Sequence, residues 1–299
     1  MFIEQRYERY TAQDHETWRA LYARMLPLWR AHATPRFLAG LESLALDPNA
    51  VPRLEDVNRF LHCRTGFRSR AVGGYVPAFH FFDCLRQRIF PTTITVRPPE
   101  QIDYLPEPDI FHDLAGHVPM HADPVFADVL ARFGECAIHA AEGPREVLAS
   151  RIRAMARFFW FTIEFGLMET SAGMKVYGSG LLSSHGEIVH AVESSEVKRR
   201  PLDLEQVVNQ PFDIDRYQPL LYVVRGFEHL YEEVSRLEQW MKLGRLDRVA
   251  GGNPEVSAED LESFAGSGVP EAGGAVSPGR IPDSCRRMAP PEIVEACLN

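Results

Sequence analysis

Large apolar residues recur at steps of three and four through much of the chain, which is the spacing of one face of an α-helix. The pattern is clearest in residues 144–167, where it is carried by Leu148, Ile152, Met155, Phe159 and Ile163. The same spacing predicts further helices over residues 11–32, 35–46, 54–63, 79–90, 124–135 and 224–242. Thr11 and Asp14 are both of the residue types that cap a helix start, so either can begin the first helix. The chain is therefore predicted to be mainly helical.

Glycine-rich stretches and short apolar runs interrupt the helices. Residues 65–77 (TGFRSRAVGGYVP) favour a simple hairpin, although the same glycines would let the backbone approach a flat ligand closely. Residues 176–184 (VYGSGLLSS) suit a turn between short strands, and residues 94–96 suit a short strand that ends before Arg97. The expected fold class is mainly α with short β-hairpins.

The composition is that of a globular protein, because 45% of the 299 residues are hydrophobic and 24% are charged. Gly, Pro, Ser and Ala dominate after residue 248, which predicts one folded domain over residues 1–248 and a disordered tail over 249–299. A net charge of −9 argues against binding to nucleic acid or to anionic membranes. The five cysteines form no CxxC pair and the first residues lack the apolar core of a signal peptide, so a soluble, cytoplasmic protein is expected.

Two histidines in the segment YLPEPDIFHDLAGHVPMH (104–121) have the chemistry of metal ligands. A short helix is expected to begin at Pro108 and to end at Gly116, where glycine favours a left-handed stop. On a continuous α-helix, His112 and His117 would point about 140° apart around the axis. A break at Gly116 would let His117 fold back toward His112. Neutral imidazole binds iron, zinc or copper.

Glu164 supplies a third candidate ligand. It lies within RFFWFTIEFGLM (157–168), a run of large apolar side chains in which an unpaired carboxylate would be strongly destabilising. Two histidines and one carboxylate are the ligands of non-haem iron oxygenases, which keep coordination positions open for dioxygen and substrate. Histidine and glutamate also bind hydrolytic zinc, but the sequence has no HExxH motif, and Asp113 is the only stand-in for its glutamate. A non-catalytic metal-binding protein with a vestigial site is a further alternative, which the complete ligand set argues against.

Arg97 and two serines complete the polar residues of interest. The Arg97 guanidinium has the shape to hold a substrate carboxylate with two hydrogen bonds. It has equally the chemistry of a structural partner for Asp109 or Glu107, and the sequence does not separate these alternatives. Ser183 and Ser184 lie outside any GxSxG context, which argues against a serine hydrolase.

The motifs PEPDIFHDLAGHVP, FWFTIEFGL and YGSGLLSS occur in this order, and together they resemble the catalytic domain of the pterin-dependent aromatic amino acid hydroxylases. The similarity is densest between residues 66 and 222 and points to the short bacterial phenylalanine hydroxylases. It implies that His112, His117 and Glu164 bind Fe(II), that a tetrahydropterin supplies two electrons, and that O2 is the co-substrate. Animal members carry a regulatory domain and a tetramerisation helix without counterparts here, so the resemblance implies a monomer.

The resemblance also assigns roles to residues around the metal. The amino acid substrate would be bound by Arg97, Tyr104, Leu105, Pro108, Trp160 and Ser183. Within this set, Arg97 would hold the substrate carboxylate, steadied by Asp109, and Ser183 would orient a ligand histidine. The pterin would be cradled by Val72, Gly74, Val76, Phe81 and Asp113, with Phe81 stacked on its ring. Phe159 would lie beside the iron and the pterin, where most relatives have tyrosine.

The resemblance favours phenylalanine as the substrate. Trp160 stands where tryptophan hydroxylases tend to have phenylalanine, and Ile214 stands where tyrosine hydroxylases have an acidic residue. The implied reaction is hydroxylation of L-phenylalanine at the para carbon to give L-tyrosine. Phe159 replaces a tyrosine and Ala115 a larger apolar residue, so attack at the meta carbon, or on tyrosine or tryptophan, stays open as an alternative.

Overall fold

A computed structural model describes residues 1–103 and 107–266 of the chain. Tyr104 and Leu105, which the resemblance places at the substrate, lie outside the described residues, as do residues 267–299 of the predicted tail. Within the described part of the chain, none of the helices combines the length and the apolar character needed to span a bilayer.

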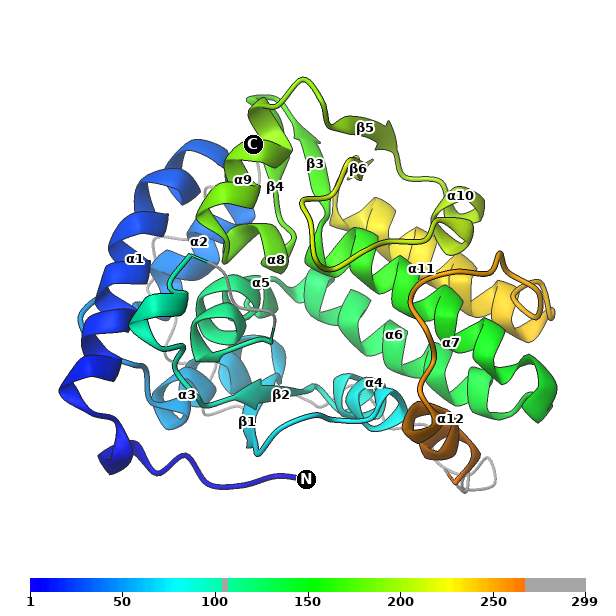
Figure 1. The fold of residues 1–299 in the computed structure, drawn as a ribbon, viewed down its shortest axis with the longest axis horizontal. Coiled ribbons are helices and arrows are strands. Elements are labelled where there is room, and N and C mark those ends of the chain that lie inside the picture. The colour runs from blue at the N-terminus through cyan, green and yellow to red at the C-terminus, as the bar shows by residue number, and fades with distance from the viewer. Residues whose placement is uncertain (104–106, 267–299) are drawn as a thin grey trace.

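The N-terminal part is built from α1 (Ala12–His32), α2 (Pro35–Leu44) and α3 (Leu54–Thr65). Thr11 caps α1: its hydroxyl accepts the N–H of Asp14, and the Asp14 carboxylate accepts the N–H of Thr11 at 2.7 Å. This reciprocal pair satisfies two of the amides that a helix start leaves without partners. The buried Trp29 of α1 donates its indole N–H to the carbonyl of Leu182 at 2.6 Å, which ties α1 to the later elements seen beside it in Figure 1.

Three long helices form the other half of the molecule: α6 (Pro124–Ala141), α7 (Arg145–Phe159) and α11 (Phe227–Lys242). Figure 1 shows that α6 contacts both of the others. The shorter helix α4 (Ala78–Arg86) crosses α6 at Gly134, where a Cβ atom would lie 2.5 Å from the carbonyl oxygen of Phe82. Glycine at this position therefore permits the close crossing.

Two small sheets connect the helices. β1 (Arg68–Val72) pairs in parallel with β2 (Ile89–Thr93). The second sheet has the order β4-β3-β6-β5, with the bounds β4 (Gly173–Val176), β3 (Leu167–Thr170), β6 (Leu220–Val224) and β5 (Lys198–Pro201). Short helices link the elements: η1 (Tyr7–Arg9), η2 (Pro99–Gln101), α5 (Val118–His121), α8 (Ser179–Leu182), α9 (His185–Glu193) and α10 (Leu204–Asn209).

The mainly α class is confirmed, and three details of the predicted strands are wrong. Residues 176–184 do not turn between two strands, because they lead from the end of β4 into the helix α8. Residues 65–77 hold one strand, β1, because its partner β2 follows α4 and makes a β-α-β crossover in place of a hairpin. Residues 94–96 lie beyond the end of β2 and form no strand. The β3–β4 pair is the antiparallel hairpin of the fold.

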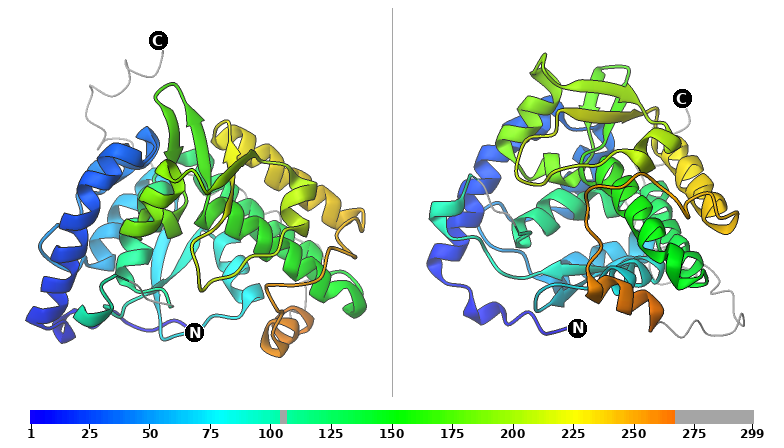
Figure 2. Two further views of the ribbon diagram at one scale, coloured as in Figure 1. Left: turned by 45° about the horizontal axis from the view of Figure 1, so that its top comes forward. Right: turned by 45° about the vertical axis from the view of Figure 1, so that its right-hand side comes forward.

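The first part of the predicted tail is folded onto the domain. Helix α12 (Ala258–Ala265) begins at Ser257, whose hydroxyl accepts the N–H of Asp260 at 3.0 Å. Phe264 is 1% exposed and packs edge-on against Phe79 of α4, with ring centroids 5.2 Å apart. Figures 1 and 2 show α12 beside α4. The folded unit therefore extends past residue 248, at least to Gly266.

Candidate active site

A π-helix brings the two motif histidines together. The segment η3 (His112–His117) has π geometry and runs directly into α5. In a π-helix the backbone hydrogen bonds join residues five apart, so side chains with this spacing lie on one face. The Nε2 atoms of His112 and His117 are 3.2 Å apart as a result.

The predicted helix break at Gly116 is therefore wrong, and the glycine serves another purpose. A Cβ atom at Gly116 would lie 2.9 Å from the carbonyl oxygen of Ser179 and 3.4 Å from the Cβ of Ser183. Glycine lets α8 pack directly on η3, which brings Ser179 and Ser183 against the histidines.

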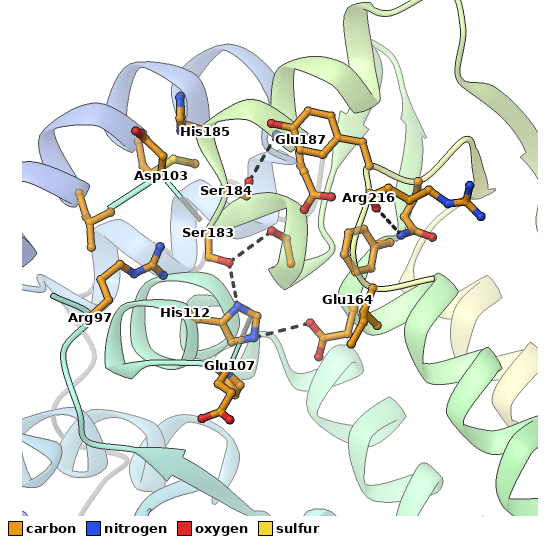
Figure 3. Close-up of a pocket in the computed structure, with 18 of the residues that line it drawn as sticks. Arg97, Asp103, Glu107, His112, Glu164, Ser183, Ser184, His185, Glu187 and Arg216 are labelled. Carbon is orange, nitrogen blue, oxygen red and sulfur yellow. Dashed lines mark hydrogen bonds and ion pairs between the residues drawn. The ribbon is translucent and has the colours of Figure 1, made fainter. Parts of the chain in front are cut away.

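Glu164 reaches the same point from the opposite side. It ends a second π-helix, η4 (Trp160–Glu164), which continues α7. Its carboxylate oxygens lie 3.2 Å from His117 Nε2 and 3.7 Å from His112 Nε2, and Figure 3 shows His112 and Glu164 pointing at each other. Neighbouring ligands of one cation have similar separations, since each bond to the metal is about 2.0–2.2 Å long in zinc sites. One ligand atom from each of the three residues lies within 4.8 Å of the others, so the donor set fits a single metal ion.

The protonation states of His112 and Glu164 also suit a cation. Burial disfavours the charged form of His112 and lowers its pKa to about 4. Burial alone would raise the pKa of Glu164, but His117, His112 and a hydrogen bond from Ser179 outweigh it and lower the pKa to about 2. At neutral pH His112 is thus a neutral imidazole and Glu164 a carboxylate, which are the forms that bind metal. Burial alone would lower the pKa of His117, but Glu164 outweighs it and raises this pKa, so a metal ion would have to displace the proton of His117.

Ser183 sets the orientation of His112. The serine hydroxyl donates to the carbonyl oxygen of Ser179 at 2.9 Å, so its oxygen is left to accept from His112 Nδ1 at 2.8 Å. This network assigns the proton of His112 to Nδ1 and leaves the Nε2 lone pair facing Glu164. A hydrogen bond of this kind fixes both the ring and its tautomer.

Arg97 and Asp109 form a buried pair beside the triad. Arg97 Nε lies 2.8 Å from Asp109 Oδ2, and Nη2 lies 2.9 Å from Oδ1. The Asp109 carboxylate also accepts the backbone N–H of His112 at 3.0 Å. Burial alone would raise the pKa of Asp109, but Arg97 and the backbone donors outweigh it and hold the pKa below its usual range. Asp109 therefore links the position of Arg97 to the start of η3.

A cavity of about 570 Å³ opens in front of the triad. Among the residues that line it are members of the metal set and of the predicted substrate set: His112, Glu164, Arg97, Pro108, Trp160 and Ser183. The Trp160 ring is stacked on Phe212 with centroids 4.2 Å apart, so this wall is fixed in place. Figure 3 shows Arg97, Ser183 and Glu164 around the same space.

A second cavity, of about 290 Å³, lies on the other side of Phe159 and Trp160, which line both cavities. Val76 and Phe81 from the predicted pterin set line it, and the Phe81 ring stands edge-on to Phe159 with centroids 5.7 Å apart. The metal-side cavity is rich in charged groups, whereas the walls of this second cavity are mainly apolar.

Comparison with known proteins agrees with this geometry. The family profile described as "Biopterin-dependent aromatic amino acid hydroxylase" matches residues 6–246. Phenylalanine-4-hydroxylase of Chromobacterium violaceum is 38% identical over 264 residues, which cover 88% of this chain and 87% of that protein. The chain belongs to the biopterin-dependent aromatic amino acid hydroxylases.

Solved structures of the family have the same fold. The structure of C. violaceum phenylalanine hydroxylase with bound iron(III) and the oxidised cofactor 7,8-dihydrobiopterin matches with a TM-score of 0.76 at 37% identity, covering 86% of this chain and 90% of that one. Rat tyrosine 3-monooxygenase is 36% identical over 238 residues, which are 77% of this chain and 46% of that protein. The chain is thus a phenylalanine hydroxylase-like member of the family.

Three of the five residues predicted to cradle the pterin of this hydroxylase do not line the second cavity. Val72 is buried in β1, and Gly74 lies in the loop that follows. The Asp113 carboxylate points to β2 and accepts the N–H of Thr93 at 2.6 Å, while burial raises its pKa to about 7. Only Val76 and Phe81 of the predicted set are walls of that cavity.

Glu187 and Gln218 are among the residues of the metal-side cavity that the sequence did not indicate. Glu187 lines it, and burial raises the pKa of its carboxyl to about 7. In the sequence Glu187 follows Ser184 by three, which reads as a helix cap, and Ser184 does accept the Glu187 N–H at 3.4 Å. Gln218 accepts the indole N–H of Trp160 at 3.3 Å from a loop that carries no motif.

Proposed function

We propose that this hydroxylase converts L-phenylalanine to L-tyrosine, using Fe(II), a tetrahydropterin and O2. The observation that carries the proposal is the convergence of His112, His117 and Glu164 at the edge of a cavity that also contains Arg97 and Trp160. The curated bacterial relatives named phenylalanine-4-hydroxylase support this substrate.

The triad would hold Fe(II), which together with the pterin supplies the chemistry that activates O2. Two of the four electrons that reduce O2 come from the pterin and two from the ring C–H bond, so one oxygen atom enters the ring and the other ends as water. His112 and His117 would bind the iron as neutral imidazoles, and Glu164 would be the anionic ligand. Ser183 keeps His112 Nε2 aimed at the metal, and Phe159 and Phe165 help to exclude water from the reacting ring.

The amino acid would lie between Arg97 and Trp160. Arg97 is pre-oriented by Asp109, so its guanidinium needs little rearrangement to accept a carboxylate. Trp160, held between Phe165 and Phe212, offers a flat apolar wall to the aromatic ring. This arrangement suits a zwitterion with one aromatic side chain.

Apolar positions favour phenylalanine over tyrosine. Ile214 lines the cavity where an acidic residue would be needed to match the tyrosine hydroxylases, and Phe159 adds no hydroxyl group. Hydroxylation at the meta carbon is the second candidate, because Phe159 lines the cavity with a phenyl ring where most relatives have a tyrosine.

The test is anaerobic loading with Fe(II), followed by addition of air, a tetrahydropterin and L-phenylalanine, with chromatography of the products. Para-tyrosine, formed only when iron and pterin are both present, is the expected product. Meta-tyrosine would overturn the assigned ring position, and preferential turnover of tyrosine or tryptophan would overturn the substrate. A lack of pterin oxidation with all three amino acids would contradict the proposal as a whole.

A further inference from the structure

The C-terminal segment 254–265 forms one side of the second cavity. Pro254, Glu255, Val256 and Asp260 line this cavity together with Phe81. The family profile ends at residue 246, so this wall lies beyond the part of the chain that the profile describes. Figure 2 shows α12 at the end of a long excursion that brings the chain back to α4.

Asp260 ties the segment to the loop between β1 and α4. Its Oδ1 atom accepts the hydroxyl of Tyr75 at 2.7 Å and the N–H of Ala78 at 2.8 Å. Ala78 is the first residue of α4, and the residue before it, Pro77, makes no side-chain cap. Asp260 therefore caps α4 from 182 positions away in the sequence.

The Asp260 carboxylate is itself held in place, because Ser257 donates its hydroxyl to Asp260 Oδ2 at 2.7 Å. A second hydrogen bond joins α12 to α4: the N–H of Phe79 donates to the hydroxyl of Ser263 at 3.3 Å. Burial and the Asp260 carboxylate together raise the pKa of Tyr75 to about 12, so the Tyr75 hydroxyl stays a donor at physiological pH. The contacts with Phe79 and Tyr75 lie on either side of Val76.

We propose that segment 254–265 is the outer wall of the tetrahydropterin pocket, and that Asp260 sets the affinity for the pterin by fixing Val76 and Phe81. The proposal rests on the proposed function, since it takes the second cavity as the cofactor site. The geometry supports it because Phe81 lies in the first turn of α4, whose start is the position that Asp260 caps. A flat heteroaromatic ring suits a slot between Phe81 and apolar side chains.

Asp260 is a positioning residue, and replacing it tests whether the wall determines the affinity for the pterin. Asp260→Ala is expected to raise the dissociation constant of 7,8-dihydrobiopterin, measured by calorimetry, about tenfold, as expected for lost hydrogen bonds to a charged group. The KM for the tetrahydropterin should rise by a similar factor, while kcat at saturating pterin, iron content and the KM for phenylalanine stay within about twofold of wild type. Asp260→Asn keeps the oxygen acceptor and should restore part of the affinity.

Glu259→Ala is the matched control, because Glu259 precedes Asp260 in the first turn of α12, is exposed and does not line the cavity. Phe264→Ala, which removes the packing of α12 on Phe79, should weaken dihydropterin binding in the same direction. Unchanged or tighter pterin binding in Asp260→Ala, with wild-type protein binding normally, would overturn the proposal. Failure of the wild-type protein to bind 7,8-dihydrobiopterin would instead contradict the proposed function.

Discussion

The two cavities that meet at Phe159 and Trp160 are built in contrasting ways. The metal-side cavity is framed by buried charges that partner one another, Arg97 with Asp109 and Glu164 with the two histidines. The second cavity is mainly apolar, and one carboxylate, Asp260, ties its outer wall to the rest of the fold.

Because of this difference, we expect mutations at the two cavities to have effects of different size. A buried charge destabilises the folded protein unless its partners are present. Removing one charged group from the metal-side cavity therefore leaves another buried charge unpaired. Asp260 is only half-buried, and hydrogen bonds near solvent are worth less. We therefore expect mutations at the metal-side cavity to cause large losses of ligand affinity. Mutations at the second cavity should cause smaller ones.

The largest effect is expected from Glu164→Gln. The change removes the only anionic ligand and leaves two neutral imidazoles, so the affinity for Fe(II) should fall by more than about 100-fold. Metal analysis after anaerobic titration measures it. Glu187→Gln, an identical change at another carboxyl of the same cavity, is the control and should leave iron binding unchanged. Full iron retention in Glu164→Gln would show that the triad is not the metal site.

The next largest effect is expected at Arg97. Lysine keeps the positive charge but loses the planar fork that pairs with Asp109 and with a substrate carboxylate. Arg97→Lys should raise the KM for phenylalanine roughly 10- to 100-fold, with a much smaller change in the KM for the pterin. Steady-state kinetics with each substrate varied in turn separate the two constants. Equal changes in both would mean that Arg97 only supports the fold.

A smaller effect is expected from Ser183→Ala. The loss of the hydrogen bond to His112 Nδ1 frees the ring and its tautomer, so the iron affinity should fall roughly tenfold. Ser184→Ala provides the comparison, since Ser184 caps α9 and does not contact a histidine. This control should cost about 1 kcal/mol of unfolding free energy and leave the iron affinity intact. Equal iron affinity in the two variants would show that Ser183 does not orient His112 for metal binding.

The smallest effect is a change in the pH dependence of stability at Glu187. Burial raises the pKa of its carboxyl from an ordinary value of about 4.5 to about 7, so the folded state holds this proton more tightly than the unfolded chain does. Its contribution therefore favours folding less as pH rises between these two values, and the penalty is complete above the folded pKa. Glu187→Gln should be more stable than wild type at pH 8 by roughly 1–3 kcal/mol, after allowance for partial exposure.

Chemical denaturation at a series of pH values checks the Glu187 prediction. The stabilities of wild type and Glu187→Gln should converge below about pH 4.5, where the carboxyl is protonated in both states. A stability difference that does not vary with pH would show that the pKa of Glu187 is the same in the folded and unfolded states.

The sequence carries the identity of the metal ligands, but not the way in which they meet. His112, His117 and Glu164 stand out because histidines near helix breakers and a carboxylate in an apolar run need an explanation. The π-helices η3 and η4 have no sequence rule of comparable strength. The two π-helices depend on tertiary packing. One example is the contact of α8 with Gly116, which brings together residues more than sixty positions apart in the sequence.

The composition of the C-terminal segment did not predict the wall that this segment forms. Gly, Pro, Ser and Ala around residues 249–299 predict disorder, and that average obscures one short helix with a capping Ser257 and the apolar pair Leu261 and Phe264. Local rules detect such a cap, but they do not indicate that Asp260 contacts Ala78. Contacts of this range follow from the fold and not from neighbouring residues.

The most direct test of the account is a crystal structure of the protein loaded with Fe(II) and 7,8-dihydrobiopterin under anaerobic conditions, with anomalous scattering recorded at the iron edge. We predict one iron peak within bonding distance of His112 Nε2, His117 Nε2 and Glu164. We also predict a pterin ring against Phe81, inside the wall formed by residues 254–265. An iron peak on other ligands, or a pterin bound outside this wall, would contradict the account.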